Sequence, residues 1–303
     1  MSDIRLGISG WTYPDWKGTF YPKKLAAKSE LEYASRCFNS IELNGTFYSL
    51  HKPETFQKWH DQTPENFVFS IKAPQFITHV LRLRDCEEPL STFLASGLLC
   101  LKKKLGPILW QFPPYLTLKD NRFEEFAKLL PHDTIHAAEI AKNHSSRIEG
   151  RAFTESPGNF PVRHAFELRH PSFKNPNFIE MLKAHRIAVV FADSTKHSPY
   201  FEDLTSDFVY IRMHGENPTF KKGYSDSALK RMAKRVTTWI KGGQPKDADC
   251  ASKGDPTPGP KDIFLYFNND EKVNSPQDAQ RMQKLLKLKP ESQSKLRKAP
   301  NAR

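Results

Sequence analysis

The sequence predicts an α/β fold of the TIM-like (β/α)8 barrel type, and two observations support this class. Eight short runs of alternating apolar and polar residues are spread along the chain, with amphipathic stretches of helical length between them. Such alternation favours a parallel sheet with helices packed outside it. Polar residues gather late in the runs, as they do at the catalytic rim of a barrel. The structural rival, a doubly wound open sheet, would bury both strand faces in apolar contacts.

Each predicted strand has an apolar face and a second face that is polar near its end, because successive side chains point to opposite faces. Ile41 and Leu43 share one face of their run, and Glu42 lies on the other. In a later run Val190 and Ala192 oppose Asp193 in the same way, so this carboxylate is expected to point into the barrel. The eight runs lie at 4–9, 40–48, 67–73, 108–112, 166–169, 190–193, 211–214 and 265–270.

Seven stretches between and after the strands have helical periodicity. Their apolar residues recur at three- and four-residue spacing, as Phe123, Phe126 and Leu130 do. This spacing places the apolar residues on one side of a helix, which can then cover the sheet. The predicted helices are 29–38, 53–62, 90–105, 122–130, 176–185, 226–241 and 275–288.

Length and composition predict one barrel domain over residues 1–288. The chain has 303 residues and 38% hydrophobic content, enough for a substantial core. No apolar run reaches membrane-spanning length, so no membrane contact is expected. The N-terminus lacks the basic and apolar regions of a signal peptide, so we expect a cytoplasmic protein. The four cysteines show no CxxC pairing, which favours neither a zinc knuckle nor a disulfide framework.

The net charge of +12 is partly concentrated in segments that are predicted to be peripheral. Residues 289–303 contain a single acidic residue, Glu291, and are predicted to form a basic disordered tail. Such a tail solubilises a protein; nucleic-acid contact is the alternative suggested by charge alone. Residues 242–261 are rich in Gly and Pro, and we predict a flexible loop insertion there.

Seven ionisable side chains lie late on the strands, opposite aliphatic residues. A single residue of this kind is often half of a structural ion pair. Burying all seven would be costly, however, and a barrel that needs only stability could be filled with aliphatic side chains. The sequence therefore predicts a balanced polar pocket at one end of the barrel, suited to an anionic small molecule. The seven residues are Glu42, Lys72, Glu167, Arg169, Asp193, Arg212 and His214.

Eight longer sequence motifs occur in order along the chain. They are GISGWTYPDWKGTFYP from Gly7, IELNGTFY from Ile41, FSIKAPQFITH from Phe69, GPILWQFPP from Gly106, HAFELRHPSF from His164, FADS from Phe191, DFVYIRMHG from Asp207 and LYFNND from Leu265. Over residues 4–288 this set resembles the YecE-like family, the bacterial domain of unknown function 72. The resemblance implies a TIM-like barrel and no established activity. By this resemblance the rim motifs fall on Ser9, Trp11, Tyr13, Glu42, Asn44, Tyr48, Lys72, Gln111, Glu167, Arg169, His170, Asp193, Arg212, His214 and Asn268.

The residue types favour a metal-independent enzyme of hydrolase or lyase type. Glu42 or Glu167 could act as a general base, and His214 as a proton carrier near neutral pH. Lys72 supplies a point charge or, if its pKa is depressed, a nucleophilic amine. Two carboxylates could also perform glycoside chemistry, which depends on their separation. The predicted catalytic set is Glu42, Lys72, Glu167, Asp193 and His214.

The remaining rim residues are predicted to bind the ligand, a phosphorylated or carboxylated small molecule. Arg169 and Arg212 can hold such a group through paired donors. Aromatic rim residues could stack on a sugar or base, or pack the loops over the barrel mouth. The predicted ligand-binding set is Ser9, Trp11, Tyr13, Asn44, Tyr48, Gln111, Arg169, His170, Arg212 and Asn268.

Two other functions remain open. Glu42, Glu167, Asp193 and His214 offer donors for a divalent metal, as in barrels of the endonuclease IV type, which are phosphoesterases or nucleases. The neighbouring cations would compete with a metal for these carboxylates, and the chain has no HExxH motif. No metal or cofactor is therefore predicted. The last alternative is a non-catalytic ligand-binding protein, since a fold does not determine a function.

Overall fold

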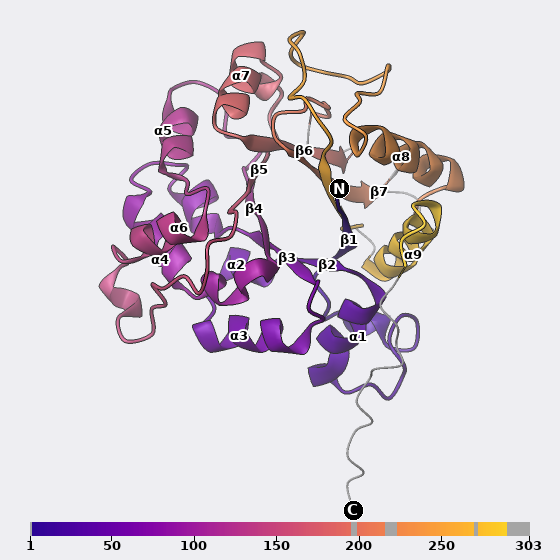
Figure 1. Ribbon diagram of the computed structural model, residues 1–303, viewed down its shortest axis with the longest axis horizontal. Coiled ribbons are helices and arrows are strands. Elements are labelled where there is room, and N and C mark those ends of the chain that lie inside the picture. Colours follow the sequence, from indigo (N-terminus) through magenta and orange to yellow (C-terminus); the bar gives the residue numbers. More distant parts are fainter. Residues whose placement is uncertain (1, 195–198, 216–222, 270–271, 290–303) are drawn as a thin grey trace, which may run out of the picture.

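Eight parallel strands close into a barrel in the order β1 to β8 (Figure 1). The structure is a computed structural model that describes residues 2–194, 199–215, 223–269 and 272–289. β1 pairs with both β2 and β8, which closes the sheet and confirms the TIM-like barrel over the open-sheet rival. The strands are β1 Ile4–Ser9, β2 Ser40–Leu43, β3 Val68–Lys72, β4 Leu105–Gln111, β5 His164–Glu167, β6 Ile187–Ser194, β7 Phe208–Gly215 and β8 Asp262–Phe267.

Helices surround the barrel, and a helix forms in each of the seven predicted stretches. The prediction of one helix over 90–105 is wrong in its second half. Gly97 interrupts it with a φ of 114°, and a Cβ there would lie 2.5 Å from the Cα of Pro53. A 3-10 segment, Leu98–Lys104, follows. The helices are α1 Glu30–Cys37, α2 Gly45–Tyr48, α3 Pro53–Gln62, α4 Glu87–Ala95, α5 Arg122–Leu129, α6 Thr134–Ala141, α7 Pro176–Ala184, α8 Asp226–Trp239 and α9 Ser275–Leu285.

The barrel interior changes from apolar to polar along the strands. An apolar cluster fills it with Leu109, Ala165, Ala188, Val190, Ala192, Phe208, Tyr210, Phe264 and Tyr266. The two tyrosines begin the polar layer: the hydroxyl of Tyr266 lies 2.7 Å from Oγ of Ser40, and that of Tyr210 lies 2.7 Å from Oγ of Ser70. Their rings thus belong to the core while their hydroxyls support the charged groups above.

The connection from β6 to β7 is irregular in its described part. Its described residues, 199–207, contain no helix. Phe201 and Leu204 are nevertheless buried, at 2% and 3% exposure. A segment without regular secondary structure thus places buried apolar side chains against this part of the barrel.

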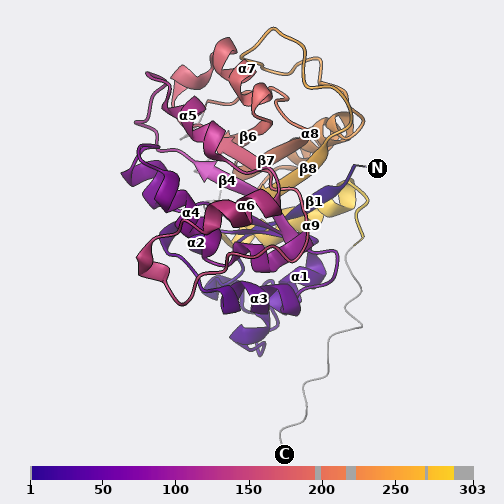
Figure 2. The same ribbon diagram turned by 60° about the vertical axis from the view of Figure 1, so that its left-hand side comes forward.

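The predicted loop insertion, 242–261, packs over this irregular segment. The backbone N–H of Glu202 donates to the carbonyl of Asp249 at 2.8 Å, and that of Ala251 donates to the Asp203 carboxylate at 2.7 Å. Figures 1 and 2 show the loop beside α7, where Lys183 donates to a loop carbonyl. The loop therefore packs against the outside of the barrel, and its flexibility stays a prediction.

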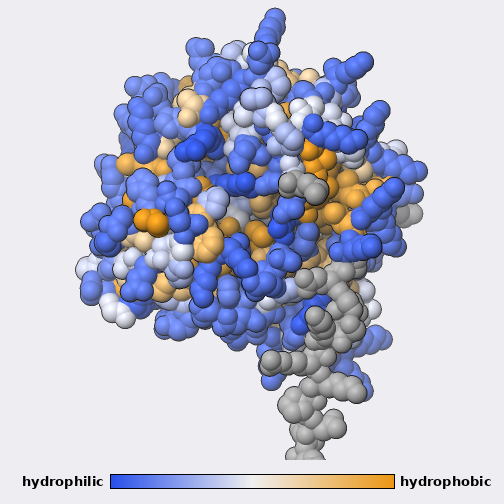
Figure 3. Space-filling view, viewed as in Figure 1, coloured by the Kyte–Doolittle hydropathy of each residue, from blue (hydrophilic) through white to orange (hydrophobic). Residues whose placement is uncertain are grey.

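One face of the molecule is shown by its hydropathy in Figure 3. Hydrophilic side chains cover most of the face in Figure 3, with smaller hydrophobic areas between them. Among the described helices, none has the length and apolar character needed to cross a membrane. The predicted basic tail lies outside the described residues except for Lys289.

Candidate active site at the rim of the barrel

Arg212, on β7, is the centre of a buried charge cluster. Its Nε and Nη2 donate to Glu42 at 3.0 and 2.9 Å, and its Nη1 donates to Glu167 at 2.5 Å. The arginine is 1% exposed and both carboxylates are fully buried. Strand alternation correctly predicted that these three residues meet. One guanidinium thus joins β2, β5 and β7 through charge-assisted hydrogen bonds.

Hydroxyl and amide groups complete the surroundings of Glu42. It accepts hydrogen bonds from the hydroxyls of Ser9 and Tyr210, the latter at 2.7 Å. Asn44 donates to Oγ of Ser9 at 2.8 Å, and the hydroxyl of Tyr13 donates to the Ser9 carbonyl at 2.8 Å. Burial alone would raise the pKa of Glu42, but Arg212 and these donors lower it below its ordinary value. Glu42 is therefore a stable anion.

Glu167 has a similar set of donors. Gln111 donates to its Oε1 at 2.9 Å, and Nε and Nη2 of Arg169 approach the same oxygen at 2.9 and 2.8 Å. Burial opposes ionisation, yet Arg212 and Arg169 hold the pKa of Glu167 well below its ordinary range. Neither buried carboxylate has the raised pKa that a general acid requires.

Lys72, the last residue of β3, is a buried cation at the rim. It is 8% exposed, and its Nζ lies 3.8 Å from the centre of the Phe47 ring. No acidic side chain within the described ranges forms an ion pair with it. Burial and repulsion from Arg212 lower the pKa of Lys72 to about 7, although Glu167 and Glu42 favour the charged form. A neutral amine is therefore available near neutral pH.

His79 is a neighbour of this site that strand alternation missed. It lies on a π-helical turn, Phe76–Val80, and its ring meets Phe47 edge to face at a centroid distance of 5.2 Å. Burial and the charge of Lys72 lower the pKa of His79 to about 4. The motif beginning at Phe69 contains both residues, and this was the available signal.

His214 enters the barrel as predicted, but its surroundings disfavour the expected role as a proton carrier near neutral pH. Its Nδ1 lies 3.4 Å from the amide nitrogen of Asn268, the residue directly after β8. Burial and the nearby Arg212 lower the pKa of His214 to about 3. The ring is therefore neutral at pH 7 and does not change charge there.

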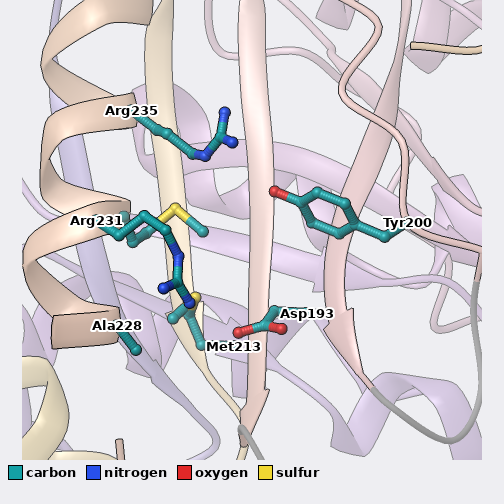
Figure 4. A pocket seen from close by; sticks show the side chains of 7 residues that line it. Asp193, Tyr200, Met213, Ala228, Arg231 and Arg235 are labelled. Carbon is teal, nitrogen blue, oxygen red and sulfur yellow. The ribbon is translucent and has the colours of Figure 1, made fainter. Parts of the chain in front are cut away.

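Asp193 does not join the cluster, which corrects the predicted convergence. Its carboxylate points out of the barrel toward α8, where it lines a cavity of about 180 Å³ (Figure 4). Tyr200 and Arg231 face the same cavity. The inward side of β6 is instead taken by Val190 and Ala192. Both faces of this strand are apolar, so alternation alone could not identify the inner one.

The predicted anion clamp is wrong for Arg212. All three of its side-chain nitrogens donate to Glu42 or Glu167, and the residue is 1% exposed. Arg169 differs because its side chain is 19% exposed. Its Nη1 makes no hydrogen bond to a described residue, so this nitrogen is available to a ligand.

Three other predicted ligand-binding residues make different contacts. His170 caps the turn Pro171–Phe173, and its Nδ1 accepts from the backbone N–H of Ser172 at 3.1 Å. Trp11 packs edge to face on Trp59, at a centroid distance of 5.5 Å. Tyr48 is 72% exposed on α2. In the described structure none of the three has a hydrogen bond to the charge cluster.

The site residues do not fit the divalent-metal alternative. Across the part of the chain that is described, no group of three or more His, Cys, Asp or Glu side chains is arranged to hold a metal. Glu42 and Glu167 already accept from guanidinium groups, and Asp193 points out of the barrel. A cation would have to displace Arg212 from both carboxylates.

The model of the family described as "Protein of unknown function DUF72" matches residues 5–303. The chain belongs to the DUF72 family. This confirms the resemblance that the motifs indicated. The UPF0759 protein YecE of Escherichia coli K12 is 36% identical over 110 residues, and that match spans 36% of this chain and 38% of YecE. The UPF0759 protein YunF of Bacillus subtilis 168 is 25% identical over 307 residues, covering 94% of this chain and 95% of YunF.

Solved DUF72 structures share the fold. A DUF72 family protein from Thermotoga maritima has a TM-score of 0.68 and 25% identity, with 94% of this chain and 99% of that chain covered. One from Enterococcus faecalis has a TM-score of 0.64 and 20% identity, with 95% and 99% covered. The names of these DUF72 proteins state no activity, so a function must be argued from the site.

Proposed function

We propose that this DUF72 protein is a metal-independent enzyme of lyase type that forms a Schiff base through Lys72. The substrate would be a small phosphorylated or carboxylated carbonyl compound. One observation carries the proposal: Lys72 is buried, lacks an acidic partner among the described residues and has a pKa of about 7. Desolvation and a neighbouring cation are what activate a lysine as a nucleophile.

The proposed reaction begins with the neutral amine. The lone pair of Nζ forms a bond to the carbonyl carbon, the C=O bond breaks, and the oxygen leaves as water with the two protons that Nζ loses. One proton from solvent then converts the imine into an iminium ion. The iminium draws electrons from an adjacent C–H or C–C bond, which is the bond that a lyase breaks.

The two buried carboxylates would stabilise this positive intermediate. The pKa values of Glu42 and Glu167 are both lowered, so both remain anions at neutral pH. Fixed negative charge beside a developing cation favours its formation. The same lowered values disfavour glycoside chemistry, which needs one carboxyl group to be protonated.

Charge balance supports an anionic substrate. With Lys72 neutral, the negative charges of Glu42 and Glu167 cancel the positive charges of Arg169 and Arg212. Iminium formation adds one positive charge, which a substrate carboxylate or phosphate would balance. Nη1 of Arg169 is the donor available for that group.

Reductive trapping tests the proposal. The full-length protein is incubated with pyruvate or glyceraldehyde 3-phosphate and cyanoborohydride, and adducts are located by peptide mass spectrometry. We expect one main adduct, on Lys72, and its loss in Lys72→Met. Lys261 is an internal control because it is also buried but donates its Nζ to the carbonyl of Pro258 at 3.0 Å. Labelling spread over surface lysines, with Lys72 unmodified, would contradict the proposal.

A further inference from the structure

A groove of about 550 Å³ opens at the rim beside Lys72. Phe47 connects the two, because its ring lies over the amine of Lys72 and also lines the groove. Residues 74–77 and Val80, shortly after β3, form part of the lining. A volume of this size is typical of small-molecule sites.

Exposed hydrophobic side chains line this groove. Tyr48 is 72% exposed, Phe76 48% and Val80 62%. Clustered hydrophobic residues in a concave surface indicate a binding site more often than isolated ones do. The two rings provide faces for an aromatic or branched apolar group.

The groove also carries positive charge. Arg147 and Arg151 line it, and neither guanidinium has a hydrogen bond or ion pair to a residue in the described ranges. Glu88 is the single acidic residue of its described lining. Two arginines against one glutamate favour a ligand with a negative group.

The backbone next to the groove has an unusual conformation. Phe76–Val80 is a π-helical turn, a feature frequent at functional sites. Shortly after it Arg82, Leu83 and Asp85 have positive φ values of 54°, 66° and 49°. Non-glycine residues adopt this region at an energetic cost, and such strain often accompanies a binding site.

We propose that the groove binds the apolar, acidic arm of the carbonyl substrate that reacts with Lys72. The arm would place a ring or branched chain against Tyr48, Phe76 and Val80, and a carboxylate or phosphate near Arg147 and Arg151. This inference rests on the proposed function and narrows its substrate class to anionic carbonyl compounds with an apolar body. Single-stranded nucleic acid is the competing occupant, because aromatic and arginine side chains also bind it.

Binding is tested first without any reaction at Lys72. The probe is 4-methylbenzoate, which has a ring and a carboxylate but no aldehyde or ketone, titrated into the full-length protein and followed by ligand-observed NMR. We expect equal affinity for wild type and Lys72→Met, and roughly tenfold weaker binding to Phe76→Ala. Arg151→Gln should also weaken it. Ile135→Ala and Lys24→Gln are matched controls at exposed positions outside the groove, and should change nothing.

Reductive trapping then tests whether a ligand in the groove also reaches Lys72. The probes are 4-formylbenzoate, which has the ring, and glyoxylate, which has an aldehyde and a carboxylate but no ring. Phe76→Ala should reduce adduct formation at Lys72 with 4-formylbenzoate and leave the glyoxylate adduct unchanged. Val80→Asp, also at an exposed position, is a second variant with the same expectation.

The outcomes separate the two proposals. If glyoxylate is trapped at Lys72 but neither groove variant affects 4-formylbenzoate or 4-methylbenzoate, the groove inference is overturned and the Lys72 reaction stands. If 4-methylbenzoate binds as expected but no aldehyde is trapped, the groove remains a site for an apolar anion and the Schiff base is rejected. Failure of 4-methylbenzoate to bind, with a salt-sensitive oligonucleotide complex lost in Phe76→Ala, would assign the groove to nucleic acid.

Discussion

The amine of Lys72 lies over the ring of Phe47, 3.8 Å from its centre. Phe47 is itself 7% exposed, so its ring adds to the burial of the amine. A cation gains some stabilisation from an aromatic face, but this gain is smaller than the cost of losing water. Phe47 therefore favours the neutral amine.

Removal of the Phe47 ring should restore water to the amine. We expect Phe47→Ala to raise the pKa of Lys72 from about 7, because burial is the largest cause of its depression. The measurement is the pH at which half of Lys72 reacts with acetic anhydride, followed by peptide mass spectrometry. Phe47→Leu keeps an apolar cover and should shift this pH less. An unchanged value in Phe47→Ala would mean that other side chains cover the amine.

Lys72 should also make stability depend on pH. The unfolded chain holds this proton up to an ordinary pKa of about 10.4, whereas the folded chain releases it at about 7. The unfolded state thus binds more protons in this window, and the contribution of Lys72 to stability rises with pH from about 7 to 10.

Urea unfolding at pH 6 and pH 9 measures this contribution. Relative to wild type, Lys72→Met should be more stable at pH 6, and this advantage should shrink by roughly 2–3 kcal/mol at pH 9. Lys24→Met, at an exposed position, should follow the wild-type pH dependence. If Lys72→Met were more stable than wild type by the same amount at both pH values, Lys72 would have the same pKa in the folded and the unfolded state.

Replacement of Arg212 tests whether the charge cluster is structural. We expect Arg212→Lys to lower the free energy of unfolding by about 3–5 kcal/mol, because one ammonium cannot bridge two buried carboxylates. Arg163→Lys is the control at a partly exposed pair, with Asp207 and Asp262, and should cost less than about 1 kcal/mol. Similar urea midpoints for the two variants would contradict the bridging role.

The charge of Glu167 should support the protonated form of Lys72. Glu167→Gln is nearly isosteric and removes that charge, so the pKa of Lys72 should fall further below about 7. The measurement is again the pH at which half of Lys72 reacts with acetic anhydride. Asp193→Asn is the matched control, because that carboxylate points out of the barrel. A shift in Asp193→Asn as large as in Glu167→Gln would contradict the assigned geometry.

Strand alternation predicted the barrel and the main charge cluster because most strands differ clearly between their faces. On β7 the inward residues Tyr210, Arg212 and His214 are polar or charged, while Ile211 and Met213 are not. Alternation gives the direction of a side chain but not its partners. It therefore could not show that Arg212 is enclosed by two carboxylates and unable to hold a ligand.

Two other features, the inner face of β6 and the position of His79, could not be predicted from the periodicity of the sequence. On β6, Val189 and Phe191 face the helices while Val190 and Ala192 face the barrel, so hydrophobicity does not tell the two faces apart. His79 lies on a turn after β3, where alternation has ended. Its position beside the site depends on the fold of the turn, which the spacing of apolar residues does not encode.

The packing of loop 242–261 on the β6–β7 connection affects the order in which the chain can fold during synthesis. The carbonyl of Leu204 accepts from the backbone N–H of Thr257 at 2.9 Å, so the β6–β7 connection waits for a partner that is synthesised about fifty positions later. A nascent chain that ends before this loop leaves the sector around Phe201 and Leu204 open to water and to chaperones. This sector is therefore fully covered only after residues 242–261 have been synthesised.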